Sequence, residues 1–128
     1  MGNISEIQPG ITGHSSLTVE TRDTARAYGS GLVEVFATPA MIALMEKTAH
    51  ESVRPFLPKG YLTVGSEVNI KHIKATGLRR EVKAASLLMR VEGKKLTFKV
   101  EAHDEEGKIG YGTHTRYIVE EKTFMQSL

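Results

Sequence analysis

The stretch from Phe36 to Arg54 constrains the fold most, because it has the pattern of a single long amphipathic helix. Thr38 stands at the expected N-cap, and Pro39 follows at the first helical position, where a missing N–H costs nothing. The residues predicted for the apolar face are Met41, Ile42, Leu44, Met45, Ala49 and Val53. The rest of the chain must therefore supply a surface that covers this face.

Glu46 is the exception on the predicted helix. At about 100° per residue, it lies about 40° from Ile42 and about 20° from Val53, at the edge of the apolar face. A carboxylate in this position is either a flank residue that reaches water or a group placed for chemistry.

Period-two alternation dominates the chain after the helix. Residues 61–73 are predicted to form a strand with one buried face made of Leu62, Val64, Ser66, Val68, Ile70 and His72. Gly65 inside this run indicates a bulge or a close backbone approach. Further strands are predicted over residues 15–21, 80–91, 94–103 and 108–119. In the 94–103 strand, the residues expected to point inward are Leu96, Phe98, Val100 and Ala102.

The element order is strand, long helix and four strands joined mainly by tight turns. One helix cannot cover two faces of a sheet, so we predict an α+β domain over residues 1–128. In it, a curved five-stranded antiparallel sheet wraps round one long central helix. Residues 1–13, with glycines and a proline, are expected to be a flexible lead-in, and residues 22–37 a loop.

Composition excludes several kinds of chemistry. The 128 residues contain no Cys, which rules out disulfides and a thiol nucleophile and favours a reducing, cytoplasmic location. The net charge of +2 is too small to indicate nucleic-acid binding. No run reaches the roughly 18 apolar residues of a membrane span, and neither a signal peptide nor a membrane partner is expected. The five His are not spaced as metal ligands, so no metal site is expected.

Four residues have the chemistry of an acyl-transfer hydrolase. Thr38 offers a hydroxyl, Glu46 a nucleophile or base, and His72 an imidazole that can move a proton at neutral pH. Gly65 can bring a backbone N–H close to a developing oxyanion. Each also has a purely structural interpretation: a helix cap, a solvated flank residue, a core histidine and a plain bulge.

His114 and Arg116 share a face of the last predicted strand, in a run that also contains Gly110 and Gly112. The low bulk of this run predicts that something approaches the backbone there. That could be a ligand, or simply a neighbouring side chain crossed by the sheet.

Three segments carry a family resemblance: residues 35–49, 64–76 and 91–116. In them the chain resembles hotdog-fold thioesterases, most closely the fluoroacetyl-CoA thioesterase-like group. The resemblance implies a hotdog fold and a homodimer, or dimer of dimers, whose sheets join edge to edge with active sites near the interface. It also implies hydrolysis of a short acyl-CoA to a carboxylic acid and CoA, with no cofactor beyond the CoA of the substrate.

The resemblance also assigns residues. The predicted catalytic set is Thr38, Glu46 and His72, with Glu46 as nucleophile or base, Thr38 orienting it and His72 handling the proton. The residues predicted to bind substrate are Gly65, Leu32, Val35, His114 and Arg116. Residues 28–35 carry glycines and a leucine where the fluoroacetyl-specific enzyme has an aromatic lid, so we expect a broader or different acyl preference. A non-catalytic protein that binds a CoA ester or other small ligand, and an acyl-thioester dehydratase or isomerase, are the alternatives.

Overall fold

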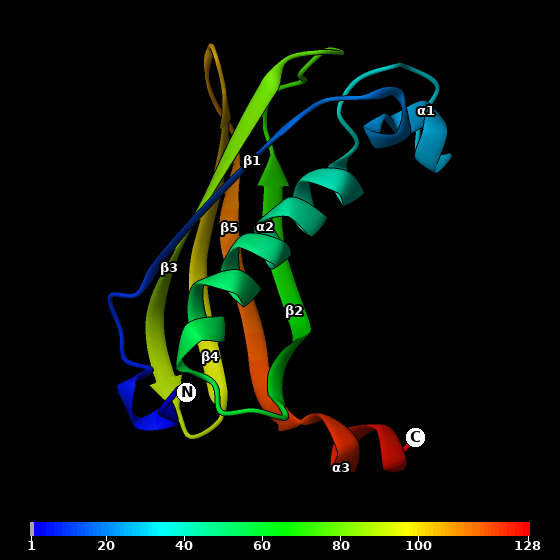
Figure 1. The fold of residues 1–128 in the computed structure, drawn as a ribbon. Coiled ribbons are helices and arrows are strands. Elements are labelled where there is room, and N and C mark those ends of the chain that lie inside the picture. Colours follow the sequence, from blue (N-terminus) through cyan, green and yellow to red (C-terminus); the bar gives the residue numbers. More distant parts are fainter. Residues whose placement is uncertain (1) are drawn as a thin grey trace.

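The computed structural model describes residues 2–128 and shows one antiparallel sheet crossed by one long helix (Figure 1). The strands are β1 (Thr12–Thr18), β2 (Tyr61–His72), β3 (Glu81–Glu92), β4 (Lys95–Asp104) and β5 (Gly107–Glu120), and the long helix is α2 (Thr38–Val53). The short helices are η1 (Ile4–Glu6), η2 (Thr21–Asp23), α1 (Ala25–Tyr28), η3 (Arg54–Phe56) and α3 (Glu121–Gln126). The strand order is β1-β3-β4-β5-β2, which leaves β1 and β2 at the edges. The predicted five-stranded sheet around a central helix is confirmed.

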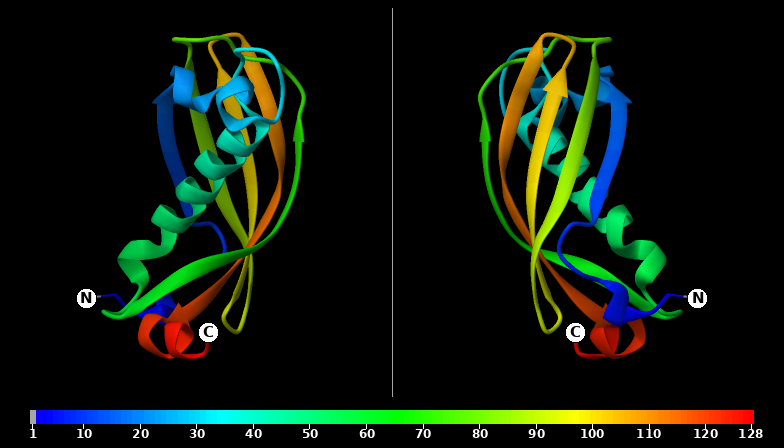
Figure 2. Two further views of the ribbon diagram at one scale, coloured as in Figure 1. Left: turned by 90° about the vertical axis from the view of Figure 1, so that its right-hand side faces the viewer. Right: turned by 90° about the vertical axis from the view of Figure 1, so that its left-hand side faces the viewer.

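The core lies between α2 and the face of the sheet that it crosses (Figure 2). Met41, Met45 and Val53 of α2 are fully buried. The predicted inward residues of β4 are also buried: Leu96, Phe98, Val100 and Ala102. The predicted periods of the helix and of β4 therefore identified the two surfaces that face each other. No helix within residues 2–128 is long and apolar enough to cross a membrane.

The start of α2 differs by one residue from the prediction. Ala37, in an extended conformation, is the N-cap, and its carbonyl accepts the first helical hydrogen bond from Met41 N at 2.9 Å. Thr38 is therefore the first helical residue, and the prediction that it caps the helix is wrong. Its hydroxyl is not used for capping, so it is free to bond elsewhere.

A bulge in β2 changes which of its residues face the helix. Gly65 pairs with Arg116 and Glu67 pairs with Thr115, so Ser66 is an extra residue. Before the bulge, the helix-facing residue is the buried Thr63, which pairs with the buried Ile118. The predicted continuous buried face is therefore wrong for its first half, Leu62, Val64 and Ser66. After the bulge, Ile70 and His72 face the helix as predicted, and Val68 stays 42% exposed because β2 is an edge strand.

The N-terminal residues are packed, contrary to the predicted flexible lead-in. Ile4–Glu6 forms η1, Ile7 is 4% exposed within the core, and β1 already begins at Thr12. The loop predicted before the long helix contains η2 and α1, and the C-terminal α3 was not predicted. These short elements lack the extended apolar periodicity that identified α2 and β4.

The glycines of β5 permit two close approaches, as their low bulk predicted. A Cβ at Gly110 would lie 2.5 Å from the flexible end of the Met41 side chain, whereas one at Gly112 would lie 2.0 Å from the Asn69 carbonyl oxygen of β2. The neighbours are thus a core side chain and the adjacent strand, and the second cannot move without breaking the β2–β5 pairing.

We expect Gly112→Ala to destabilise the fold by about 3 kcal/mol and Gly110→Ala by about 1–2 kcal/mol, because the Met41 side chain next to Gly110 can shift whereas the Asn69 backbone next to Gly112 cannot. Urea unfolding of both variants measures the difference. Equal losses for the two variants would contradict this arrangement of β2 over β5.

Candidate active site

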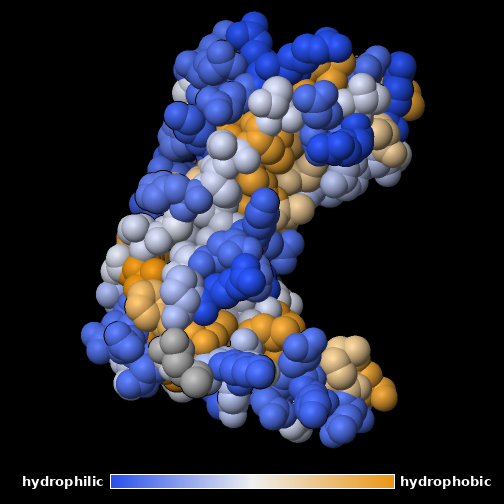
Figure 3. Space-filling view, in the orientation of Figure 1, coloured by the Kyte–Doolittle hydropathy of each residue, from blue (hydrophilic) through white to orange (hydrophobic). Residues whose placement is uncertain are grey.

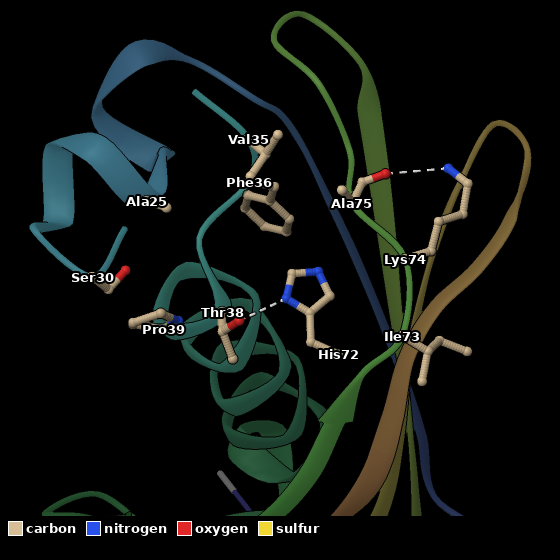
Figure 4. Close-up of a pocket in the computed structure, with 10 residues that line it drawn as sticks. All are labelled: Ala25, Ser30, Val35, Phe36, Thr38, Pro39, His72, Ile73, Lys74 and Ala75. Carbon is tan, nitrogen blue, oxygen red and sulfur yellow. Dashed lines mark hydrogen bonds between the residues drawn. The ribbon is translucent and has the colours of Figure 1, made fainter. Parts of the chain in front are cut away.

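Thr38 and His72 meet where the start of α2 approaches the end of β2 (Figure 4). The helix start brings Thr38 there, and the last residue of β2 is His72, so the two elements converge on the pair. The Thr38 Oγ1 atom lies 2.8 Å from His72 Nδ1, which is hydrogen-bonding distance. The structure therefore brings two of the three predicted catalytic residues together within one chain.

The pair lines a pocket of about 440 Å³. Val35, Phe36 and Pro39 form one side of it, and Ile73 to Ala75 form another (Figure 4). Thr38 is exposed at this pocket, so its hydroxyl is accessible to a bound molecule. An accessible hydroxyl next to an imidazole, in a partly apolar hollow, can hold and polarise a small carbonyl compound.

The environment of His72 favours the neutral form of its ring. Burial lowers its pKa from the ordinary value of 6.5. Its second ring nitrogen, Nε2, is buried and makes no hydrogen bond within residues 2–128. A neutral imidazole with one nitrogen on a hydroxyl and the other unpaired can accept or pass on a proton.

The pocket walls are tied together by Asp104 at the β4–β5 turn. Its carboxylate accepts hydrogen bonds from Lys74 Nζ at 2.6 Å and Thr76 Oγ1 at 2.9 Å. The Thr76 carbonyl in turn accepts from Phe36 N at 2.8 Å, two residues before Thr38. Burial opposes ionisation of Asp104, but these bonds and one from the Glu106 backbone together lower its pKa to about 2. One carboxylate thus fixes the segments that carry both Thr38 and His72.

Glu46 lies elsewhere in the same chain. It is two turns further along α2, about 12 Å along the axis from Thr38 at 1.5 Å per residue. Its side chain is 39% exposed, and its Oε2 lies 3.8 Å from Arg116 Nη1 and 3.9 Å from His114 Nε2. Within residues 2–128 its ionic partners are these two residues, and it bonds to neither Thr38 nor His72.

Gly65 is next to the Glu46 carboxylate. A Cβ at Gly65 would lie 2.7 Å from Glu46 Oε2 and 3.2 Å from Arg116 Nη1. The predicted close approach at this glycine is therefore real, and the group that approaches is a carboxylate. The absence of a side chain leaves the space that Glu46 occupies.

Arg116 and His114 lie behind Glu46 and are buried at 7% and 1% exposure. The Arg116 guanidinium donates to Thr63 through Nε at 2.8 Å and through Nη2 at 2.9 Å, and its Nη1 lies 3.1 Å from His114 Nε2. The two remaining predicted residues differ in exposure: Val35 lines the pocket of Thr38, whereas Leu32 is 86% exposed.

The sequence does not identify Asp104 or Thr63 as site residues. Asp104 falls between the strands predicted over residues 94–103 and 108–119, and no local pattern indicates that its carboxylate is buried. The bulge predicted at Gly65 is the signal for Thr63, because an extra residue in a strand switches the residues before it to the opposite face. Within residues 2–128, no three His, Asp or Glu side chains gather as metal ligands.

The sheet order, the single long helix and the comparisons with solved structures define a hotdog fold. The fluoroacetyl-CoA-specific thioesterase FlK superposes with a TM-score of 0.89 at 30% identity, covering 94% of each chain. A Thermus thermophilus thioesterase superfamily member superposes with a TM-score of 0.87 at 25% identity, covering 94% of this chain and 90% of the other.

The chain belongs to the fluoroacetyl-CoA-specific thioesterase family, whose model matches residues 19–122. It is 36% identical over 91 residues to the fluoroacetyl-CoA thioesterase of Streptantibioticus cattleyicolor. That match covers 71% of this chain and 66% of the relative, just under two thirds of the relative's length.

The Asp104 network gives a pH-dependent prediction. Because its pKa is lowered to about 2, its stabilisation is complete above the ordinary carboxyl value of 3.8 and is lost as the pH falls through about 2. Asp104→Asn should therefore cost about 1–3 kcal/mol at neutral pH, and less as the pH approaches 2. Denaturant unfolding between pH 2 and 7 measures this, with the exposed Glu92→Gln as control. A pH-independent deficit would contradict the role of the charge.

We also expect His72 to titrate below 6.5, because its burial disfavours the charged ring. The neutral form dominates at pH 7, and the protonated form grows as the pH falls. Ring NMR signals followed against pH measure this. A value above 6.5 would show that the imidazole is stabilised as a cation and does not fit a neutral proton acceptor.

Proposed function

We propose that the protein is an acyl-CoA thioesterase that hydrolyses a short acyl-CoA to a carboxylic acid and CoA. The observation that carries the proposal is the Thr38–His72 hydrogen bond of 2.8 Å at the pocket of a chain in this family. A related structure, a point mutant of FlK in complex with fluoroacetate and CoA, superposes with a TM-score of 0.87 at 31% identity, covering 92% of this chain and 99% of that one. That complex supports a CoA ester as the ligand class.

The chemistry assigns a role to each group. Water adds its oxygen to the thioester carbonyl carbon, the C–S bond breaks, and the thiolate leaves with one proton. Glu46 either takes the proton of the attacking water or first attacks the carbon itself, giving an anhydride that water then opens. Thr38 holds the acyl group, and His72 moves the proton toward the sulfur. Both routes need only water besides the thioester, so we propose no resident cofactor.

The separation of Thr38 and Glu46 indicates a site shared between two chains. One thioester carbonyl cannot contact both residues of a single helix when they stand about 12 Å apart along its axis. A second copy related by a two-fold axis can bring its Glu46 to the Thr38–His72 pair of the first. We therefore propose a homodimer in which each site combines Thr38 and His72 of one protomer with Glu46 and Gly65 of its partner.

The β2 side of the molecule fits such a partner. Strand β2 lies at the edge of the sheet, so one row of its backbone groups is available for pairing. The molecule is hollowed on this side, between the α1 region and α3 (Figure 3). The exposed Val68 lies on the helix-facing side of the same strand. Edge-to-edge pairing would cover this residue and continue the sheet into the second copy.

The acyl preference should differ from that of a fluoroacetyl-specific enzyme. Leu32, in the segment that corresponds to the aromatic lid, is 86% exposed and does not line the pocket, so it does not close it as a bulky ring would. We propose that a broader range of short acyl groups is accepted. A cytoplasmic location, expected from the absence of Cys, remains a prediction.

Two variants test the activity and the shared site together. Glu46→Gln and His72→Ala should each lower kcat for short acyl-CoAs by about 100-fold or more, because each removes a proton-transfer or attacking group. Free thiol release across an acyl-CoA panel measures this. Mixing the two inactive variants with subunit exchange should restore about a quarter of the wild-type rate, since half of the dimers then hold one complete site of two.

Glu51→Gln, on the exposed face of the same helix, is the matched control and should keep the wild-type rate. No thiol release by the wild type across the panel would refute the proposed activity. Full activity of Glu46→Gln alone would remove the carboxylate from the mechanism. Inactive parents with no recovery on mixing would refute the shared site and leave the activity standing.

A further inference from the structure

His114 is the most deeply buried ionisable group near Glu46, and the hydrolytic mechanism leaves it without a role. It is 1% exposed, so in this chain it is closed off from a bound substrate. It lies on β5 between Arg116 and the backbone of β2, and it pairs with Val68 in the part of β2 that follows the bulge. Its two ring nitrogens have different partners, and these partners determine its protonation.

The tautomer of His114 follows from its contacts. Nδ1 lies 2.8 Å from the Glu67 carbonyl oxygen, which can only accept, so Nδ1 carries the proton. Nε2 lies 3.1 Å from Arg116 Nη1, which can only donate, so Nε2 presents its lone pair. Both conditions are met only by the neutral ring with its proton on Nδ1.

The guanidinium of Arg116 is held at three points. Thr63 accepts at its hydroxyl and at its carbonyl, and His114 accepts at the nitrogen that also lies nearest to Glu46. Without His114 Nε2, that nitrogen would lose its acceptor while the other side of the guanidinium stayed attached to Thr63. The orientation of Nη1 toward the Glu46 carboxylate, at 3.8 Å, therefore depends on His114.

We propose that His114 is a positioning residue for the reaction: its Nε2 lone pair holds Arg116 beside Glu46, and the Glu67 carbonyl fixes the tautomer that makes this possible. This inference rests on the proposed thioesterase function for its effect on turnover. The hydrogen-bonded arrangement of the Glu67 carbonyl, His114 and Arg116, which we call the clamp, is a property of the folded chain. It assigns to His114 a role through Arg116 in place of the direct substrate contact predicted from the sequence.

The clamp should open on acidification. A second proton on the ring would go to Nε2, which would place two donors and two positive charges 3.1 Å apart. The charged and titratable groups around His114 and Arg116 are Glu46 and His50, both on α2. From β4, the uncharged Phe98 ring lies against His114, with the two ring centres 6.4 Å apart. The nearest opposing charge, Glu46, is 3.9 Å from Nε2 and partly exposed, so water screens it.

The test compares His114→Gln with His114→Asn. The longer Gln carboxamide can place an acceptor near the Nε2 position, whereas Asn reaches only the Nδ1 position and leaves Arg116 without its acceptor. We expect His114→Gln to stay within about 3-fold of wild-type kcat and His114→Asn to fall by about 10-fold or more, with KM unchanged in both. This is measured by thiol release.

A second readout does not depend on turnover. Nitrogen-15 NMR of the wild type should show His114 neutral with its proton on Nδ1. The Arg116 side-chain N–H signals should be protected in the wild type and in His114→Gln, and lost in His114→Asn. Lowering the pH should remove the protection in the wild type but not in His114→Gln.

An Nε2-protonated or charged His114 at neutral pH would overturn the proposal, as would equal behaviour of the two variants. A rise in KM without a fall in kcat would overturn it in favour of direct substrate binding. A wild type that releases no thiol would refute the proposed function, and the NMR measurements would still uphold or overturn the clamp. If His114→Asn does not fold, the wild-type tautomer and the pH response of His114→Gln decide.

Discussion

The fixed spacing of Thr38 and Glu46 on one rigid helix is the constraint on which the rest of this molecule depends. Eight residues of α-helix place the two groups about 12 Å apart along the axis. The helix cannot bend to bring them together, because Met41, Met45 and Val53 are locked in the core against the sheet. Each end of the helix segment therefore builds its own half of the proposed site, one around Thr38 and one around Glu46.

The two halves are held by different means. At the Thr38 half, Asp104 ties together the segments that precede Thr38 and follow His72, through Lys74 and Thr76. At the Glu46 half, a bulge in β2 places Gly65, Thr63 and the Glu67 carbonyl so that Arg116 and His114 are hydrogen-bonded behind the carboxylate. In both halves, a group that reaches the pocket or solvent is backed by buried partners whose own geometry is fixed, which is the usual design of a precise site.

Much of the fold could be predicted from the sequence, because α2 and β4 have clean hydrophobic periods that identify their buried faces. The start of α2 was misplaced by one residue because Ala37, with no capping side chain, is the N-cap. The first half of β2 was assigned to the wrong face because alternation alone does not show where an extra residue enters a strand. The packing of the N-terminal residues could not be predicted, because Ile7 is buried by core residues that are distant from it in the sequence.

The candidate site was predictable in part. The pairing of Thr38 with His72 followed from residue type and the family resemblance, whereas the separate position of Glu46 follows from helix geometry once both residues are on one helix. The partners of Arg116 could not be predicted, because they depend on the register of β2 against β5. The buried Asp104 carboxylate likewise depends on a turn and a loop that meet only in the folded chain.

The most direct test of this account is a crystal structure of the Glu46→Gln variant with an uncleaved short acyl-CoA. The account predicts that the thioester carbonyl lies against Thr38 and His72 of one protomer and against residue 46 of its partner. A carbonyl in contact with residues 38 and 46 of the same chain, or bound away from both, would contradict the shared site.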